Sequence, residues 1–181
     1  QAPTAALRRA DALEGAGRLD EAIEAYEQIA KTWPHAGEAG EAARRLQRLR
    51  APELRIGQPQ VGAVGQAPEI EVVTRNIEAL DVRVHALDLE AWFREKGTIL
   101  GVDSLALEIV KPDVTATWKT ASYAPFRRFE AKQSVPVTQA GAYVVVAGDT
   151  QLTATSLVLV SDVECVVKKG ERGSLLVWVF E

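Results

Sequence analysis

The sequence contains very little cysteine: Cys165 is the one cysteine in 181 residues. A single cysteine cannot form a disulfide within the chain, so the sequence indicates neither an oxidising nor a reducing compartment. Cys165 lies among valines, at Val163, Val166 and Val167. This setting predicts a small side chain within a β-strand rather than a reactive thiol.

Long apolar runs are also lacking. No stretch approaches the ~18 consecutive apolar residues that cross a bilayer, and no signal peptide is visible. Methionine is absent and the chain begins at Gln1, which indicates an excised or processed chain. An export signal, if the protein has one, is therefore expected outside this sequence.

Groups that carry chemistry are scarce. There are two histidines; His35 falls in an expected loop and His85 on the polar face of an expected strand, so both are predicted to be ordinary surface residues. A catalytic triad needs a histidine held by an acid, and a metal site needs clustered ligands, whereas Asp81 and Asp88 are isolated. Residues 15–17 lack the lysine of a phosphate-binding loop. The sequence therefore predicts no catalytic residue, no metal ligand and no cofactor.

The charge is nearly balanced. The net charge is −4, and both signs are interspersed. This balance gives no reason to expect nucleic acid or an anionic membrane as a partner. Four arginines on one expected helix are offset by two glutamates one turn earlier: Arg44, Arg45, Arg48 and Arg50 against Glu38 and Glu41.

The composition divides the chain into two parts. The first fifty residues are rich in Ala, Glu, Arg and Leu, which favour helix, whereas the sequence from residue 70 onward is rich in Val, Thr and Leu, which favour strand. Between them, six prolines and glycines predict a linker with a short extended segment at Leu54 and Ile56. The expected domains are a helical segment over 1–50, a linker over 51–68, a β-sandwich over 69–162, and a hairpin over 163–181.

Three helices are predicted in the first part. They cover residues 4–15, residues 19 or 20 to just before Pro34, and residues 37–50. Thr4 is the expected N-cap of the first helix, and Gly15 and Gly17 are expected to end it. In the second helix, spacings of three and four place one set of side chains on a common face: Ala22, Ile23, Tyr26, Ile29 and Ala30.

The first two helices resemble a tetratricopeptide repeat. The matching residues are Ala10, Gly17, Leu19, Ala22, Tyr26 and Pro34. Leu13 and Ile29 depart from the motif, which has a tyrosine and a small residue there. One such repeat cannot bury its own apolar face. The resemblance therefore implies that the helices pack against the β region, a second chain or further repeats.

The second part is predicted to be an antiparallel β-sandwich, which makes the whole chain an α+β protein. Short strands alternate with turn residues about every ten positions. The expected strands cover residues 69–74, 79–87, 105–110, 115–119, 128–135, 142–148 and 153–161, with a short helix at 89–96 ending at Gly97 and a final hairpin of 165–168 with 175–180. In 79–87 the alternation predicts Leu80, Val82, Val84 and Ala86 inward, and Asp81, Arg83 and His85 outward.

The β region also resembles a known family. The runs that carry the likeness are AGAYVVVAG at 140–148, ATSLVLVSD at 154–162, VVK at 166–168 and LVWV at 176–179, with DLEAWFREKG at 88–97 as an insertion after an early strand. Their order is similar to that of the N-terminal macroglobulin domains of bacterial alpha-2-macroglobulin-like proteins. The likeness covers about residues 70–181 and is most specific from Tyr143 to Trp178.

The resemblance implies fibronectin-like sandwiches strung in series. The first would end near Asp162, and residues 163–181 would open the next domain. Members of the family trap proteases, many through a thioester in a Cys-x-Glu-Gln motif, which Val166, Val167 and Lys168 after Cys165 do not provide. The chain is accordingly expected to be a non-enzymatic scaffold from a secreted or periplasmic protein. The helical hairpin departs from the usual family plan.

Partners and alternatives remain open at this point. The expected partners are further domains of the same polypeptide, with a protease or another protein chain as further candidates and a dimer through the helical or the C-terminal hairpin as a further option. The rival hypotheses are a peptide- or protein-binding adaptor that uses the helical hairpin, and an enzyme whose active site lies elsewhere. The candidate interface residues are large aromatics, for which burial in the core is the favoured interpretation: Tyr26, Trp33, Trp92, Phe93 and Trp178.

Overall fold

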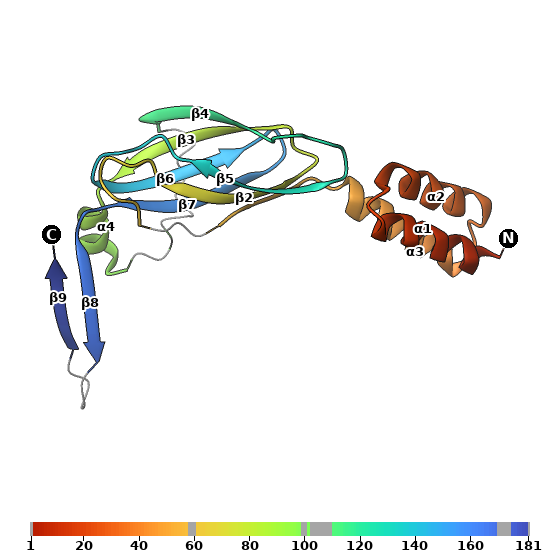
Figure 1. Ribbon diagram of the computed structural model, residues 1–181, viewed down its shortest axis with the longest axis horizontal. Coiled ribbons are helices and arrows are strands. Elements are labelled where there is room, and N and C mark those ends of the chain that lie inside the picture. Colours follow the sequence, from red (N-terminus) through yellow and green to blue (C-terminus); the bar gives the residue numbers. More distant parts are fainter. Residues whose placement is uncertain (1, 58–60, 99–100, 102–109, 170–174, 181) are drawn as a thin grey trace. The chain divides into compact units, whose positions relative to one another are not determined.

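The computed structural model describes residues 2–57, 61–98, 101, 110–169 and 175–180 (Figure 1). The described part contains four helices and antiparallel sheets, which confirms the predicted α+β class. Contacts divide the chain into two units. We call them the helical unit (Gln1–Glu53, Val73–Glu78 and Thr120–Phe129) and the sandwich unit (Leu54–Val72, Ala79–Lys119 and Glu130–Glu181).

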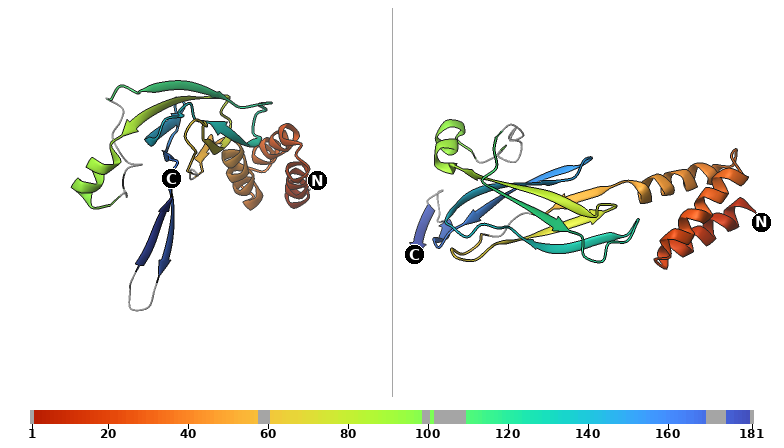
Figure 2. Two further views of the ribbon diagram at one scale, coloured as in Figure 1. Left: turned by 60° about the vertical axis from the view of Figure 1, so that its left-hand side comes forward. Right: turned by 90° about the horizontal axis from the view of Figure 1, so that it is seen from above.

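Three helices form most of the helical unit, as the sequence predicts. They are α1 (Pro3–Gly15), α2 (Leu19–Thr32) and α3 (Gly37–Arg50), and they lie side by side (Figures 1 and 2). The buried residues between them are small alanines and a few larger side chains: Ala10, Ala22, Ile23, Tyr26, Ile29, Ala42, Leu46 and Leu49. The alanines let the helices approach closely. The likeness to a tetratricopeptide repeat stays a prediction.

The start of α1 differs from the prediction. The N-cap is Ala2, whereas Thr4 lies inside the helix and donates its hydroxyl proton to Glu38 Oε1 of α3 at 2.6 Å. Pro3 explains the shift, because its fixed φ suits the first helical position and its missing N–H is not needed there. The prediction of Thr4 as N-cap is therefore wrong, and Thr4 links two helices instead.

Two segments from further along the chain complete the helical unit. The Asn76 side-chain amide donates to Leu49 O at 2.8 Å and to Ala51 O at 3.2 Å, and so satisfies carbonyls at the C-terminal end of α3. The Asn76 Oδ1 atom accepts the Phe126 N–H at 2.7 Å, and Phe126 packs against the helical core. A half-buried ion pair between Arg75 and Glu53, at 3.2 Å, lies in the same unit.

The β-strands form three antiparallel sheets. The strands are β1 (Glu53–Ile56), β2 (Glu69–Arg75), β3 (Ala79–Leu87), β4 (Val114–Lys119), β5 (Arg128–Ser134), β6 (Gly141–Gly148), β7 (Thr153–Val160), β8 (Glu164–Lys169) and β9 (Leu175–Phe180). They are ordered β1-β2-β5, β4-β3-β6-β7 and β8-β9. Of the strand predicted over 105–110, residues 105–109 lie outside the described residues. Within the stretch predicted to be a linker, β1 pairs with β2; the domain limits themselves stay a prediction.

Apolar side chains on one face of the four-stranded sheet form its core. In β3, Leu80, Val82 and Val84 are buried, as the alternation predicts. Val82 pairs with Ala147 and Val84 with Val145 of β6, so these side chains share the buried face. Ile70, Val72, Val135, Val158 and Val160 are buried as well. Cross-strand contacts of this kind are the main source of sheet stability.

The opposite face of this sheet is also covered at one end. Helix α4 covers Leu89–Lys96 and ends at Gly97, as predicted, and the structure adds Asp88 as its N-cap. Its Trp92 packs with Leu87 and Leu157 over Val144 and Val146. His85 pairs with Val144 on this face and is 3% exposed. The predictions of His85 as a surface residue and of Ala86 as an inward residue are wrong, since His85 is buried and Ala86 exposed. Where a sheet is covered on both faces, alternation no longer predicts which side chains are buried.

One segment crosses from the first sheet to the second. After β1, the Gly57 N–H donates to Glu71 O of β2 at 2.7 Å. Gly62 then forms a parallel bridge with Val160: its N–H donates to Leu159 O, and its carbonyl accepts the Ser161 N–H, both at 2.8 Å. The C-terminal end of the β7 edge is thereby paired, which protects it from pairing with another strand.

Candidate functional site

The aromatic residues proposed as an interface lie on different elements. Tyr26 is fully buried in the helical core, and Trp33 is half-buried just after α2. In α4, Trp92 is half-buried with its indole N–H donated to Thr98 O at 2.9 Å, whereas Phe93 is 54% exposed. Trp178 in β9 is 41% exposed. The structure does not bring these residues together into one surface, and an interface role for them stays a prediction.

Tyr26 anchors a polar network inside the helical unit. Its hydroxyl lies 2.6 Å from Asp11 Oδ1 and 2.9 Å from Glu14 Oε2, and Glu14 also pairs with Arg48 of α3. Burial raises the pKa of Tyr26 well above its ordinary value, and the hydrogen bonds to Asp11 and Glu14 raise it further. A phenol with such a high pKa is neutral at physiological pH. The network therefore orders the helices and offers no proton for chemistry.

The β8–β9 hairpin exposes apolar side chains on both of its faces. Val166 pairs with Trp178 and Val167 with Val177. Because cross-strand partners share a face and neighbours alternate, one face carries Val166, Leu176, Trp178 and Phe180, and the other carries Val167, Val177 and Val179. Each of these side chains is at least 41% exposed. Apolar residues on both faces are typical of a strand pair that lies between two covering layers.

A groove follows one side of the α1–α2 pair. Its volume is about 400 Å³. The floor is formed by half-buried or buried apolar side chains, and the rim by polar and charged ones: Ala6, Leu13, Ala25, Ile29 and Trp33 below, Arg9, Glu21, Glu24 and Gln28 above. We call this feature the α1–α2 groove. An apolar floor with a charged rim suits a helix or an extended segment of protein.

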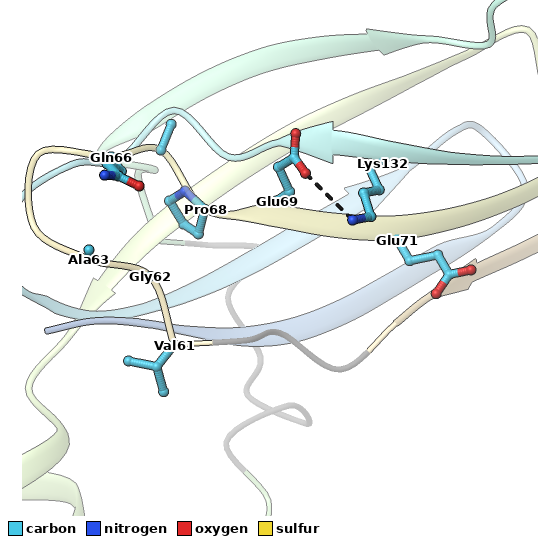
Figure 3. A pocket seen from close by; sticks show the side chains of 9 residues that line it. Val61, Gly62, Ala63, Gln66, Pro68, Glu69, Glu71 and Lys132 are labelled. Carbon is cyan, nitrogen blue, oxygen red and sulfur yellow. Dashed lines mark ion pairs between the residues drawn. The ribbon is translucent and has the colours of Figure 1, made fainter. Parts of the chain in front are cut away.

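A second hollow lies beside the crossing segment of the sandwich unit (Figure 3). Its volume is about 650 Å³, and its lining includes Gly62, Pro68 and Glu71. Glu69 and Lys132 form an ion pair across 3.9 Å, but both side chains are largely exposed. Exposed pairs of this kind contribute little and do not converge on a ligand. The hollow therefore carries no recognisable chemistry.

Within the described residues, no group of three or more His, Cys, Asp or Glu side chains is placed to hold a metal ion. His85 is a single buried histidine whose two ring nitrogens have no hydrogen-bond partner in that part of the chain. His35 is exposed, as predicted. None of the described helices is long and apolar enough to cross a membrane.

Sequence reasoning missed the α1–α2 groove. The signal was present in α1, where Ala6, Arg9 and Leu13 are spaced by three and four and so share one face of the helix. The predictions followed instead the face that packs inward, which includes Ala10.

Comparisons with known proteins gave similar solved structures, two of which are described here. The chain is similar over 70% of its length to a crystal structure of native alpha-2-macroglobulin from Escherichia coli spanning domains NIE-MG1, at a TM-score of 0.45 and 16% identity, with 69% of that chain covered. It is similar over 66% of its length to a structure of the same protein spanning domains MG0-NIE-MG1, again at 0.45 and 16%, with 42% of that chain covered. No protein-family profile and no curated protein sequence matches the chain.

Proposed function

We propose that this chain is a non-catalytic scaffold and interaction module whose β8–β9 hairpin adds two strands to a neighbouring sandwich domain of the same polypeptide. The supporting observation is the exposure of apolar side chains on both faces of the hairpin, from Trp178 at 41% to Val179 at 64%. Full burial of a single valine, leucine or phenylalanine side chain is worth roughly 1.5–3 kcal/mol. A two-stranded hairpin alone is marginally stable in water, so a covering partner would stabilise it strongly.

The strand that precedes the hairpin, β7, is already paired at its C-terminal end. The C-terminal end of β7 is already paired with Gly62, and the Asp162 carboxylate accepts the Val64 N–H at 2.9 Å. β8 begins at Glu164, just after this closed edge. These contacts favour a hairpin that serves another domain rather than an extension of β7.

Hydrogen exchange tests this role of the hairpin. In a polypeptide that includes the neighbouring domain, we expect slow amide exchange in β8 and β9, and faster exchange there when Val177→Lys or Trp178→Lys places a charge on either face. Val61→Lys is the matched control, because Val61 is also an exposed apolar side chain, at 61%, but lies outside the hairpin. Fast exchange of β8 and β9 in every form of the protein would refute the scaffold role.

The finer part of the proposal is that the parent polypeptide traps proteases and works in a secreted or periplasmic setting. The support is the sequence resemblance of residues 140–179 to macroglobulin domains. The parent polypeptide would be incubated with a broad-specificity protease and separated by gel filtration. Cleavage followed by co-elution of the protease is the expected result; an intact polypeptide with no retained protease would remove trapping and leave the scaffold role standing.

A second candidate function is a peptide-binding adaptor, which the α1–α2 groove favours. Its apolar floor and charged rim match an amphipathic helix. A panel of amphipathic helical peptides would be titrated against the whole 181-residue chain, with Leu13→Glu as the variant that places a charge in the floor. Specific binding that Leu13→Glu abolishes would support the adaptor, and absence of binding would dismiss it.

A further inference from the structure

The rims of the α1–α2 groove carry opposite charges. Arg9 lies on the α1 rim, and Glu21 and Glu24 lie on the α2 rim. Glu21 is already paired with Arg18 within the same chain. Arg9 and Glu24 are exposed, and neither forms an ion pair with the residues that the structure describes. The groove therefore presents one available cation and one available anion on its two sides.

These two charges stand at nearly the same height along the helices. α1 ends at Gly15 and α2 begins at Leu19, so the two helices form an antiparallel hairpin. Arg9 lies six residues before the end of α1, and Glu24 lies five residues after the start of α2. At a rise of about 1.5 Å per residue, the two positions differ by roughly one residue in height. They therefore face each other across the apolar floor.

We propose that the α1–α2 groove is a self-complementary surface that binds a second copy of this chain. A two-fold axis that runs parallel to the helices within the contact plane places α1 of one copy over α2 of the other. Arg9 of each copy then meets Glu24 of its partner, and the contact contains two equivalent ion pairs around a shared apolar floor. The small side chains of Ala6 and Ala25 in that floor permit close approach of the helices.

The charges also favour this arrangement over a dimer in which each helix packs on its own counterpart. A two-fold axis perpendicular to the helices within the contact plane would stack α1 on α1. When it passes at the common height of Arg9 and Glu24, it places Arg9 against Arg9 and Glu24 against Glu24. Like charges in direct opposition suppress an arrangement of this kind. The positions of Arg9 and Glu24 therefore define one dimer with antiparallel helices across the interface.

Charge reversal and charge exchange test the proposal in the whole 181-residue chain. Sedimentation equilibrium would measure the dimer dissociation constant of the native chain, Arg9→Glu, Glu24→Arg and the double variant. Since each single reversal turns two attractive pairs into repulsive ones, we expect the dissociation constant to rise about tenfold or more. The double variant restores opposite charges across the interface, and its dissociation constant is expected to return to within about threefold of the native value.

Arg8→Glu is the matched control, since Arg8 is an exposed arginine of α1 that does not line the groove. It changes the net charge as Arg9→Glu does and is expected to leave the dimer unchanged. A chain that is monomeric at all concentrations, a dimer insensitive to Arg9→Glu, or a double variant that fails to restore the dimer would each overturn the proposal.

The dimer is independent of the scaffold role of β8–β9, because its residues all belong to the helical unit. An association that Val177→Lys or Trp178→Lys abolishes, and that Arg9→Glu leaves unchanged, would assign self-association to the hairpin and reject the groove. The dimer and the adaptor function exclude each other, since a second copy would fill the groove.

Discussion

The helical unit and the sandwich unit hold together by different means. In the helical unit the buried side chains include small alanines, and polar links join the elements: Thr4 to Glu38, Tyr26 to Asp11 and Glu14, and Asn76 to the end of α3. The sandwich unit relies on β-branched and leucine side chains that pair across strands, with few polar side chains in its core. Directional bonds respond to pH and to single polar substitutions, whereas apolar packing responds to lost volume. We therefore expect polar substitutions and pH to destabilise mainly the helical unit, and cavity-forming substitutions to destabilise mainly the sandwich unit.

The largest effect is expected from a cavity in the sandwich. Leu80 is 2% exposed and lies beside Trp118 of the neighbouring strand. Leu80→Ala should reduce the free energy of unfolding of the sandwich unit by about 2–5 kcal/mol, because the lost methyl groups leave a void that neighbours fill incompletely. Hydrogen exchange resolved by peptide should show this loss in β3 and β6 and much less in α1 and α2. Equal losses in both units would show that they unfold together.

The next effect concerns Asn76, whose φ is 57°. Asn76→Ala removes three hydrogen bonds and leaves a β-carbon in the left-handed region, where alanine is disfavoured by roughly 1–2 kcal/mol. The helical unit should lose about 2–4 kcal/mol in chemical denaturation followed by helical circular dichroism. Asn76→Gly removes the unfavourable backbone conformation but still loses the hydrogen bonds, so its free energy of unfolding should be about 1 kcal/mol higher than that of Asn76→Ala. A glycine variant no better than the alanine variant would show that the backbone conformation contributes nothing.

Tyr26 gives the helical unit a characteristic pH dependence. Its pKa in the folded chain lies above the value of about 10 in the unfolded chain. The raised pKa contributes stability that is present in full below pH 10 and is lost as the pH rises above 10, by about 1.4 kcal/mol per pH unit, because the unfolded tyrosine ionises first.

Tyr26→Phe should therefore reduce the loss of stability of the helical unit at alkaline pH. At pH 7 it should lower the free energy of unfolding by about 1–2 kcal/mol, because the hydrogen bonds of the hydroxyl are lost. The measurement is chemical denaturation from pH 7 to pH 11, followed by helical circular dichroism. Tyr143→Phe in β6 is the control and should leave that decline in place. If the stability of Tyr26→Phe fell with pH as steeply as that of the native chain, the assignment of the alkaline decline to Tyr26 would be contradicted.

The smallest effect separates two glycines of the helical unit that both have open space around a β-carbon. Gly40 lies within α3 in ordinary helical conformation, so Gly40→Ala should stabilise the unit by about 0.5–1 kcal/mol. Gly17 has a φ of 73°, so Gly17→Ala should destabilise it by about 1 kcal/mol or more. Thermal denaturation should show a higher melting temperature for Gly40→Ala and a lower one for Gly17→Ala. A change in the same direction for both variants would show that backbone conformation does not distinguish the two positions.

Local patterns in the sequence predicted the elements well. Helical spacing predicted α3 over 37–50, and alternation predicted β3 over 79–87, because both depend on neighbours in sequence. The burial of His85 was missed because the second face of the sheet is also partly covered, as Trp92 over Val144 and Val146 shows, and no local pattern reports that cover. The roles of Asn76 and Phe126 were missed for the same reason, since each acts on a helix far away in the chain.

Of the two candidate surfaces, the hairpin could be predicted from the sequence and the groove could not. The β8–β9 hairpin was predicted from sequence, because glycines separate two short apolar runs. The charge arrangement of the α1–α2 groove depends on how two helices face each other, which requires the structure. Arg9 and Glu24 look like ordinary surface charges in the sequence, and only the shared groove gives them a common role.

The parallel bridge between Gly62 and Val160 bears on the order of events during synthesis. The bridge joins positions almost a hundred residues apart, so this side of the sandwich cannot close before residue 160 has left the ribosome. The helical unit has a similar delay, since Phe126 joins its core only after most of the chain has been made. A nascent chain that stalls near residue 120 would leave the helices without their last covering side chain and the first strands without their partners, and would be an easy substrate for proteases and chaperones.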